Sequence, residues 1–538
     1  MRFLQNWRAN EAMKNRVLTT LAAASILLGG AAACTDITTL PKSTVTSANI
    51  FNDPASYRAY LAKLYGGLAL SGQQGPAGQP DISGDEGFSN YIRLLWQMQE
   101  LPTDEAVIAW GDDGVQQLNT QIWGTSNQFL VNMYYRVFFQ VVHANEFLRE
   151  TTEEKLTQRG VSADLRAQIQ AYRAEARFLR ALSYWHGLDL FGSIPLVTEE
   201  DPIGGPPPQQ ATRAQLFEYA VSELNAIRGE LPARPQYGRA GQAAADMVLA
   251  KLYLNAEAYG AGNRYSDARA AAERVIAAGY QLDDRYQDMF LADNHTSPEI
   301  IFPIPQDGLN TRLFGGMTFL ISASIGNQMN AADYGMGGGW WGLRARPELV
   351  AQFGGTNTAD RRSSVFFTQG QTLEVNELTN FSNGYAVTKY RNVTSTGQPG
   401  SDRSYPDTDY PMFRLADAYL MYAEAVLRGG GGSRAQALQY VNALRQRAYG
   451  NTSGNITDAQ LTLDFILAER ARELFWEGHR RTDLVRFNNR FTTNGVWSWK
   501  GGVRAGQPTE AFRSLYPLPF SELTANPNLE QNPGYGGR

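Results

Sequence analysis

The sequence predicts a mainly α fold, in which a tetratricopeptide-like scaffold of helix pairs carries long irregular loop segments and a few short strands. Two observations support this prediction. Apolar residues recur at the i, i+3, i+4, i+7 spacing of amphipathic helices through much of the chain. The predicted helices also follow one another in pairs of about 30–40 residues, with alanine and aromatic side chains where neighbouring pairs would touch.

Periodicity and capping residues place the individual elements in chain order. Thr212 and Ser266 fit helix N-caps, and Gly279 fits the residue that follows a helix C-terminus. Short apolar runs rich in β-branched and aromatic residues are typical of small strands. The predicted helices are 54–70, 127–150, 164–190, 212–231, 242–259, 266–278, 413–427, 433–447 and 462–486, and the predicted strands are 299–304, 317–321, 363–367 and 385–390.

Composition excludes several classes of protein. Of the 538 residues, 43% are hydrophobic and 19% charged, which is ordinary for a globular protein. The 48 basic and 53 acidic residues give a net charge of −5, so we predict no basic surface and expect no nucleic-acid partner. The single cysteine allows neither an internal disulfide nor a cysteine-based zinc site.

That cysteine, Cys34, ends a segment that resembles an export signal. A basic stretch at the N-terminus is followed by an uncharged apolar run at 17–28 and by small residues at 29–33. This order is typical of a secretory signal peptide, and the run is too short to span a bilayer. Small residues before a cysteine resemble a bacterial lipobox, which would make 1–33 a lipoprotein signal peptide and Cys34 the lipidation site. An ordinary signal peptide cut near Cys34 is the alternative.

The rest of the chain is interpreted as a tether and one domain. Either Met1 or Met13 fits as the start of translation. Residues 34–47 are polar and rich in Thr and Ser, as expected of a tether. Loops on a rigid scaffold are where binding residues gather. The predicted parts of the domain 48–538 are a helical frame at about 127–290 and 410–490, and loop-rich ligand-binding segments at about 71–126 and 293–409.

Aromatic residues in the second loop segment form the first candidate binding cluster. A neutral sugar presents hydroxyl groups and flat C–H faces, so its site needs aromatic platforms and a few polar partners. Tyr334 and the pair Trp340-Trp341 flank a glycine-rich loop at 335–339. Such a loop has little bulk with which to bury two indoles, so we expect at least one of them to contact ligand. The alternative is that both pack beneath the loop.

A second candidate cluster, Asn90, Tyr91, Arg93 and Trp96, lies in the first loop segment. The planar fork of Arg93 suits neighbouring hydroxyl groups, and Trp96 would stack on a sugar ring beside Asn90. The alternative is a short amphipathic helix with Trp96 in the core. Aromatic residues from two distant loops would form an arc, which suits a curved α-glucan better than a flat chain.

Three glutamates, Glu469, Glu473 and Glu477, share the i, i+4, i+8 spacing of one helix face and resemble the paired carboxylates of a glycosidase. Arginines are interleaved with them. We interpret the block as a charge network that fixes the helix against Arg445 and Arg447, and we predict no catalytic residue.

Other patterns give no cofactor or metal site. No two of the four histidines have the i, i+4 spacing of a zinc-protease helix, and the glycines at 335–339 lack the lysine of a phosphate-binding loop. We therefore expect no cofactor. Calcium at Asp112-Asp113 or Asp283-Asp284 stays open, although neither pair fits an EF-hand loop.

Five blocks, in order along the chain, resemble the SusD/RagB family of outer-membrane nutrient-binding lipoproteins. They are Cys34 with its preceding small residues, 174–197, 414–425 with 441–448, 469–486, and 515–535. The segments 85–107 and 340–349 resemble the starch-binding branch of that family.

The resemblance implies a function. Family members sit on the outer-membrane surface through a lipid anchor, capture oligosaccharides and pass them to a TonB-dependent transporter resembling SusC, without catalysis. The expected partners are thus an oligosaccharide or polysaccharide, that transporter and the outer membrane. An exported helical glycosidase and a tetratricopeptide-type protein-interaction adaptor are the alternatives.

Overall fold

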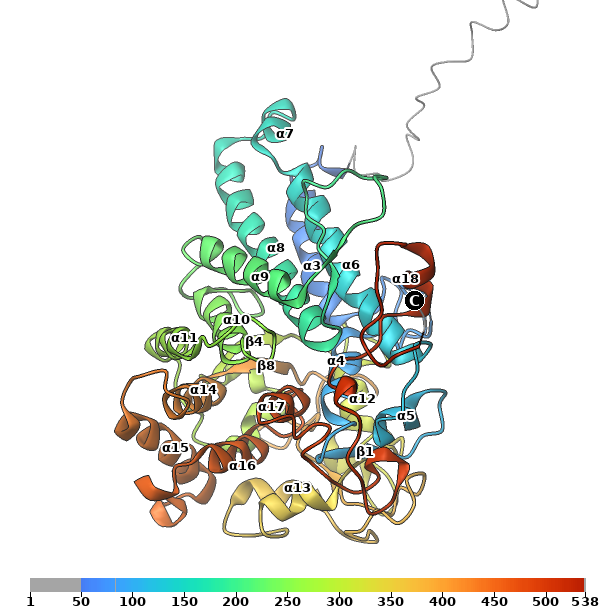
Figure 1. Ribbon diagram of the computed structural model, residues 1–538, viewed down its shortest axis with the longest axis vertical. Helices are drawn as coiled ribbons and strands as arrows, with labels where there is room; N and C mark the ends of the chain where they lie inside the picture. The colour runs from blue at the N-terminus through green and yellow to red at the C-terminus, as the bar shows by residue number, and fades with distance from the viewer. Residues whose placement is uncertain (1–49, 83, 537–538) are drawn as a thin grey trace, which may run out of the picture. The chain divides into compact units, whose positions relative to one another are not determined.

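Helices dominate the computed structural model, which describes residues 50–82 and 84–536 (Figure 1). Residues Pro54–Arg538 form one unit by their internal contacts. The predicted signal peptide, Cys34 and the tether lie outside the described residues. Within the described residues, none of the helices has both the length and the apolar character needed to cross a membrane. The mainly α fold is confirmed.

The α-helices are α3 (Ala55–Ala69), α4 (Tyr91–Glu100), α5 (Val115–Thr120), α6 (Gln128–Glu150), α7 (Glu153–Gln158), α8 (Ala163–Leu190), α9 (Arg213–Ile227), α10 (Gln242–Leu254), α11 (Tyr265–Ala277), α12 (Gly316–Ser322), α13 (Pro347–Gln352), α14 (Leu415–Leu427), α15 (Arg434–Tyr449), α16 (Leu463–Leu474), α17 (Arg480–Arg486) and α18 (Phe520–Ala525). The strands are β1 (Ala106–Ile108), β2 (Ile194–Pro195), β3 (Gln210–Ala211), β4 (Ile300–Ile304), β5 (Leu343–Ala345), β6 (Phe366–Phe367), β7 (Ala386–Val387) and β8 (Tyr410–Arg414). They form two-stranded antiparallel ladders, β1 with β5, β2 with β3, β4 with β8 and β6 with β7.

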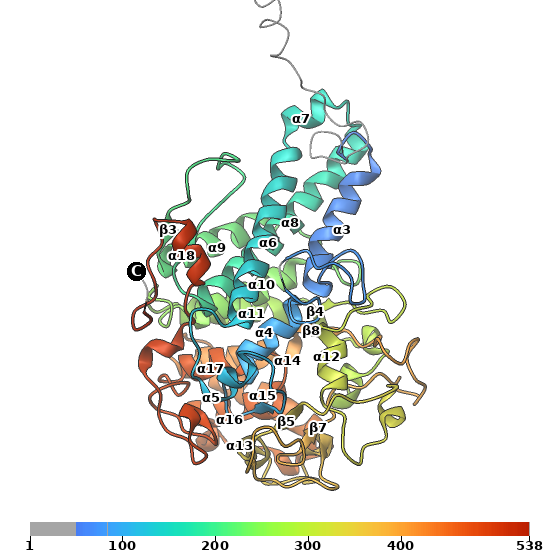
Figure 2. The ribbon, with the colours of Figure 1, turned by 90° about the vertical axis from the view of Figure 1, so that its right-hand side faces the viewer.

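Successive long helices pack against one another and build the frame (Figures 1 and 2). The main contacts join α6 to α8, α8 to α9, α10 to α11, α11 to α14 and α14 to α15. The side chains of Ala243, Ala244 and Ala245 on α10 are buried, and their small size lets neighbouring helices approach closely. The helix-pair arrangement predicted from the spacing is therefore present.

The predicted helix ends are partly right. Thr212 caps α9 in a capping box with Gln215, and Gly279, with a φ of 84°, follows the end of α11. Ser266 is not an N-cap, because α11 already begins at Tyr265.

Three predicted elements differ from the structure. Of the strand predicted at 363–367, only Phe366–Phe367 is a strand, because residues 363–365 belong to the 3-10 helix Arg361–Val365. The helix predicted at 462–486 is two helices, α16 and α17, because Trp476 and Gly478 adopt left-handed backbone angles between them. Residues 317–321, predicted as a strand, lie in α12, whose residues are all buried. A short apolar run that is buried on every side lacks the periodicity that separates helix from strand.

Two buried carboxyl groups close the break between α16 and α17. Glu100 accepts hydrogen bonds from the backbone N–H groups of Gly478 and His479 at 2.6 and 3.1 Å. Glu105 accepts one from the N–H of Trp476 at 3.2 Å, and its carboxyl group acts electrostatically on that of Glu100. Burial raises the pKa of both groups, that of Glu105 to about 7, and the charge of Glu105 raises the pKa of Glu100 further.

We expect Glu100→Gln to stabilise the protein at alkaline pH. The folded-state pKa of Glu105, about 7, lies above its reference value of 4.5. Between these two pH values the folded protein therefore binds more protons than the unfolded chain. Stability therefore falls as pH rises through this window. A neutral amide at position 100 still accepts the backbone hydrogen bonds and donates to Glu105.

The free energy of unfolding of Glu100→Gln should exceed that of the parent protein by about 1–2 kcal/mol at pH 8 and match it closely at pH 5. Urea unfolding at both pH values measures this difference. Glu153→Gln, at a largely exposed carboxylate, serves as the control and should have little effect at either pH. An equal effect of Glu100→Gln at both pH values would contradict the role of this pair.

Candidate functional site

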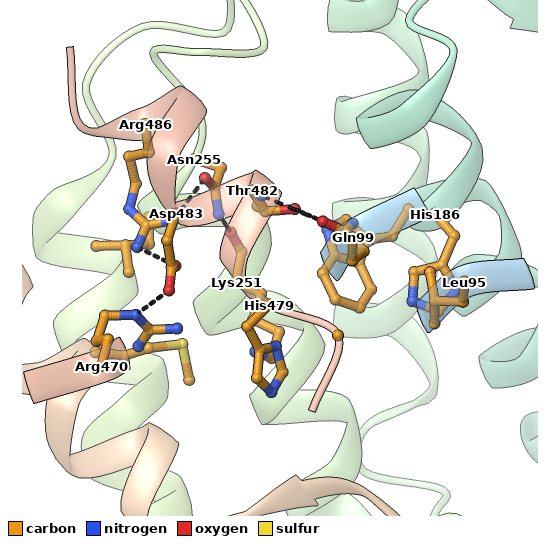
Figure 3. A pocket seen from close by; sticks show the side chains of 14 residues that line it. Leu95, Gln99, His186, Lys251, Asn255, Arg470, His479, Thr482, Asp483 and Arg486 are labelled. Atoms are coloured by element: carbon orange, nitrogen blue, oxygen red, sulfur yellow. Dashed lines mark hydrogen bonds and ion pairs between the residues drawn. The ribbon is translucent and has the colours of Figure 1, made fainter. Parts of the chain in front are cut away.

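A small polar cavity lies in the interior between α4, α8, α10 and α17 (Figure 3). Its volume is about 20 Å³, which is room for about one water molecule. Asp483 joins Arg470 and Arg486 beside it, both at 2.7 Å. Burial lowers the pKa of His186 and His479 to about 3, so both imidazoles are neutral. The cavity is too small for an organic ligand.

An open depression of about 700 Å³ lies on the surface where four distant segments meet. These segments are the stretch that leads into α4, the end of β1, the loop before α12 and the loop before β5. The lining residues are Asp85, Gly87, Phe88, Arg93, Trp110, Gly111, Asp112, Phe314 and Trp340. Four of them are aromatic, so this depression has the composition expected of a sugar site.

The β1–β5 ladder brings Trp110 and Trp340 together. Ile108 pairs with Leu343, and the next backbone hydrogen bond runs from the N–H of Ala109 to the carbonyl of Gly342 at 2.9 Å. The indole N–H of Trp110 donates to the carbonyl of Trp340 at 2.8 Å, and the two ring centroids lie 6.2 Å apart. A Cβ atom at Gly342 would approach the Trp110 ring to 2.7 Å, so this indole requires glycine there.

Phe314 completes the aromatic wall. Its ring lies 6.2 Å from that of Trp340 and is 36% exposed. The backbone N–H of Phe314 donates to the carboxylate of Glu86 at 3.1 Å, which fixes the loop before α12 to the segment before α4.

Arg93 lines the depression from the first turn of α4. Its guanidinium group lies over the rings of Phe88, Trp110 and Phe319, at 4.5, 5.6 and 4.4 Å from their centroids. Nη1 donates to the carbonyl of Gly87 at 3.2 Å, whereas Nε and Nη2 have no hydrogen-bond partner among the described residues. Burial lowers its pKa to about 10, against the nearby carboxylates of Asp112 and Asp85, so Arg93 is charged at neutral pH. The Arg93 residue is 3% exposed, so its guanidinium group places a buried positive charge behind the aromatic rings of the depression.

The structure brings Arg93 and Trp340, one residue from each predicted cluster, to the same depression. Trp341 and Tyr334 do not line it. Trp341 packs beside Phe381, and the Tyr334 ring lies 5.5 Å from the guanidinium group of Arg391.

Three residues of the predicted second cluster take part in packing and helix capping instead of lining the depression. Trp96 is fully buried, and its indole N–H donates to the carbonyl of Trp476 at 3.0 Å. Tyr91 is also buried and shares a hydrogen bond of 2.7 Å with His186. Asn90 caps α4 and donates to the carbonyl of Ala69 at 2.9 Å. The glycan-binding role predicted for these three is wrong, since their side chains are fully buried and hydrogen-bonded inside the protein, and the alternative of a short helix with Trp96 in the core holds.

Sequence reasoning missed Trp110, Phe314 and Phe88, and it considered Asp112 only for calcium. The available signal was a Trp directly after a short apolar strand and before Gly111 and Asp112. Among the described residues no group of three or more His, Cys, Asp or Glu side chains is arranged to hold a metal ion.

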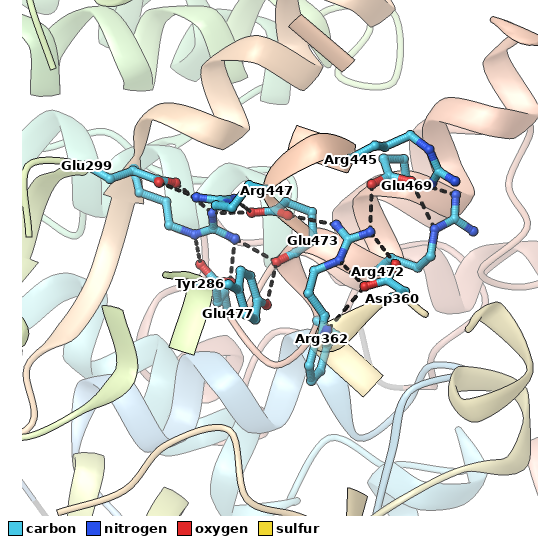
Figure 4. Close-up of polar contacts among 12 residues, drawn as sticks. Tyr286, Glu299, Asp360, Arg362, Arg445, Arg447, Glu469, Arg472, Glu473 and Glu477 are labelled. Carbon is cyan, nitrogen blue, oxygen red and sulfur yellow. Dashed lines mark hydrogen bonds and ion pairs between the residues drawn. The ribbon is translucent and has the colours of Figure 1, made fainter. Parts of the chain in front are cut away.

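The glutamates weighed as catalytic carboxylates belong to a buried ion cluster (Figure 4). Glu469 pairs with Arg445 at 2.8 Å, and Glu473 pairs with Arg362 at 2.7 Å. Glu477 lies beyond the end of α16 and pairs with Lys389 at 2.6 Å. The buried ion cluster comprises Glu299, Asp360, Glu469, Glu473, Glu477, Arg362, Lys389, Arg414, Arg445, Arg447 and Arg472. The interpretation of this block as a charge network fits these contacts.

Comparison with known proteins gives the family. A sequence model of the SusD family matches residues 362–535. Starch-binding protein SusD of Bacteroides thetaiotaomicron is 34% identical over 527 residues, which cover 88% of this chain and 91% of that protein. The chain belongs to the SusD family. The resemblance inferred from the sequence blocks is thereby confirmed.

Solved structures of SusD-family proteins share the fold. Surface glycan-binding protein A from B. thetaiotaomicron, in complex with laminarihexaose, aligns with a TM-score of 0.69 at 21% identity and covers 89% of this chain and 99% of its own. A laminarin-binding SusD-like protein aligns with a TM-score of 0.66 at 22% identity, with the same coverage of both chains.

Proposed function

We propose that this SusD-family protein binds starch-like α-glucan oligosaccharides in the open depression. The observation that carries the proposal is that the aromatic rings lining the depression are inclined to one another. The Trp110 and Trp340 rings are inclined by 47°, and those of Phe314 and Trp340 by 56°. Rings inclined in this way follow a chain that curves, whereas a flat chain needs coplanar platforms. The similarity to a starch-binding relative supports the same ligand class.

Polar groups around the wall suit the hydroxyl groups of a neutral sugar. The carboxylates of Asp85 and Asp112 offer acceptors at the rim, and the buried guanidinium group of Arg93 supplies positive charge behind the rings. The few charged groups at the edge of an otherwise aromatic surface would orient the sugar, and the rings would supply most of the contact area.

We further propose that the ligand is bound without being cleaved, at the outer-membrane surface, with Cys34 as the lipid anchor and a SusC-like transporter as the partner. Family membership supports this proposal, and so does the use of the three glutamates in buried ion pairs. A glycosidase would release reducing ends from the polysaccharide, and a protein adaptor would lack glycan affinity altogether.

The test is isothermal titration of the protein lacking residues 1–34 with maltoheptaose. Trp340→Ala should weaken the affinity by about 2 kcal/mol, roughly 30-fold, with an unchanged melting temperature. Phe520→Ala is the matched control, because its ring is 60% exposed at the start of α18 and should not affect binding.

If Trp340→Ala leaves the affinity unchanged, the depression is not the glycan-binding site. Titration with laminarihexaose tests the linkage, and tighter binding of this β-linked hexasaccharide would contradict the α-glucan assignment. Release of reducing ends from amylose by the purified protein would contradict binding without cleavage.

A further inference from the structure

Trp341 combines a strained backbone with an exposed aromatic ring. Its φ is 54°, in the left-handed region that bulky residues rarely adopt, and its side chain is 53% exposed. Such a conformation is strained for a residue with a bulky side chain, and glycine would adopt it without strain. Neither burial nor backbone geometry explains why a tryptophan stands here.

Two other tryptophans of the described chain have left-handed backbones, and both use their rings inside the protein. Trp476, with a φ of 65°, is fully buried with its ring centroid 5.1 Å from that of Trp96. Trp499, with a φ of 67°, donates its indole N–H to the carbonyl of Val375 at 2.6 Å. Trp341 differs, because its indole N–H has no partner within the described residues.

The surroundings hold Trp341 in one position. Its backbone N–H donates to the carbonyl of Ile325 at 3.0 Å, just as the N–H of Trp340 donates to that of Ser322 at 2.8 Å. A Cβ atom at Gly326 would come within 2.7 Å of the Trp341 ring, and the Phe381 ring centroid lies 6.1 Å away. The indole is therefore supported by Gly326 and Phe381 while much of its surface is open to solvent.

The loop that carries Phe381 is itself fixed. Asn327 donates its side-chain amide to the carbonyl of Gly370 at 2.9 Å and to the hydroxyl of Ser382 at 3.2 Å. The loop of Phe381, on which the Trp341 ring rests, is thus bonded to the turn after α12. The same turn accepts the hydrogen bond from the backbone N–H of Trp341. A platform that is fixed before binding loses little conformational entropy when a ligand stacks on it.

We propose that Trp341 is a second stacking platform for the same glucan chain, outside the depression that Trp340 lines. This inference rests on the proposed function. The two tryptophans are consecutive, and their backbone N–H groups are fixed by Ser322 and Ile325 at the end of α12, so both side chains start from adjoining positions of one fixed loop. Short oligosaccharides occupy the depression alone, whereas longer ones contact both platforms, so the protein selects for chain length.

The experiment compares maltotriose with maltodecaose by isothermal titration. Trp341→Ala should weaken maltodecaose binding about tenfold and leave the maltotriose dissociation constant unchanged. Trp341→Gly should show the same loss with an equal or higher melting temperature, since glycine relieves the left-handed backbone. Phe520→Ala, with an equally exposed ring elsewhere, should change neither affinity.

Two outcomes would overturn this inference. If Trp341→Ala leaves the maltodecaose affinity unchanged, the Trp341 ring does not bind the glucan and serves another contact, such as one with a protein partner. An equal loss for both ligands would make Trp341 part of the primary site. Failure of the proposed function has a different pattern, because Trp340→Ala would then leave the affinity for both lengths unchanged.

Discussion

Glu473→Ala is expected to lower the free energy of unfolding by about 3–5 kcal/mol. The Glu473 side chain is fully buried and lies 2.7 Å from Arg362 and 2.6 Å from Arg414, with Arg447 also in contact. Removal of this carboxylate leaves buried positive charge without its counter-charge. The cost of that uncompensated charge exceeds what a methyl group gains by burial.

Urea unfolding at neutral pH measures the loss. Arg434→Ala is the control, because Arg434 and Asp458 form an ion pair with side chains 43% and 63% exposed, and its loss should cost less than about 1 kcal/mol. Equal effects of the two substitutions would contradict the view that the buried ion cluster stabilises the fold.

The pH dependence of a second variant, Glu473→Gln, gives a second measurement. Although burial alone would raise it, Arg447 and Arg414 hold the pKa of Glu473 below its usual range. A lowered folded-state pKa contributes stability above the unfolded pKa, and this contribution is lost as pH falls through the folded value. The difference between the parent protein and Glu473→Gln should therefore shrink as the pH is lowered below about 4.

Trp96→Ala is expected to destabilise the protein by about 3–5 kcal/mol without changing the glycan affinity of the folded molecule. The indole is fully buried, with ring centroids 5.1 Å from Trp476 and 5.9 Å from Phe319, and its N–H is hydrogen-bonded. Its loss leaves a large cavity, and the carbonyl of Trp476 keeps only the hydrogen bond that the Tyr390 hydroxyl donates at 3.0 Å.

Thermal unfolding and titration with maltoheptaose, at a temperature where the variant is folded, separate the two effects. Trp96→Phe keeps most of the packing and should recover much of the stability. Trp340→Ala should behave in the opposite way, with weaker binding and native stability. If the Trp96→Ala variant has native stability and weak binding, Trp96 is a ligand-binding residue and its role in the core is contradicted.

The scaffold was largely predictable, because its helices are long and each buries one face. The 3.6-residue period of α6 and α8 gives their bounds to within one residue. The period gives no such guide for α4, where all ten residues are buried. A helix without a solvent face offers no contrast between its sides, so Trp96 could be assigned to either the core or the ligand.

The open depression was only half predictable from the sequence. The glycine-rich loop drew attention to Trp340, because glycines cannot cover an indole. Trp110 meets Trp340 only through the pairing of β1 with β5, across 230 residues of sequence, and three-residue strands have too little pattern to reveal their partners. Phe314 is held by the carboxylate of Glu86 and by the ring of Tyr405, which lie in segments far from it in the sequence.

The buried ion cluster also has a consequence for the order of folding. Its cations Arg362, Lys389 and Arg414 precede α16 in the chain, whereas Glu469, Glu473 and Glu477 arrive only with α16 and the turn after it. A chain emerging from its N-terminus would therefore have only Glu299 and Asp360 to balance these cations until residue 477 has appeared. The core can therefore be completed only in the last stretch of synthesis or export. A chain that ends before α16 would fail to fold, and it would not form a folded protein with weaker binding.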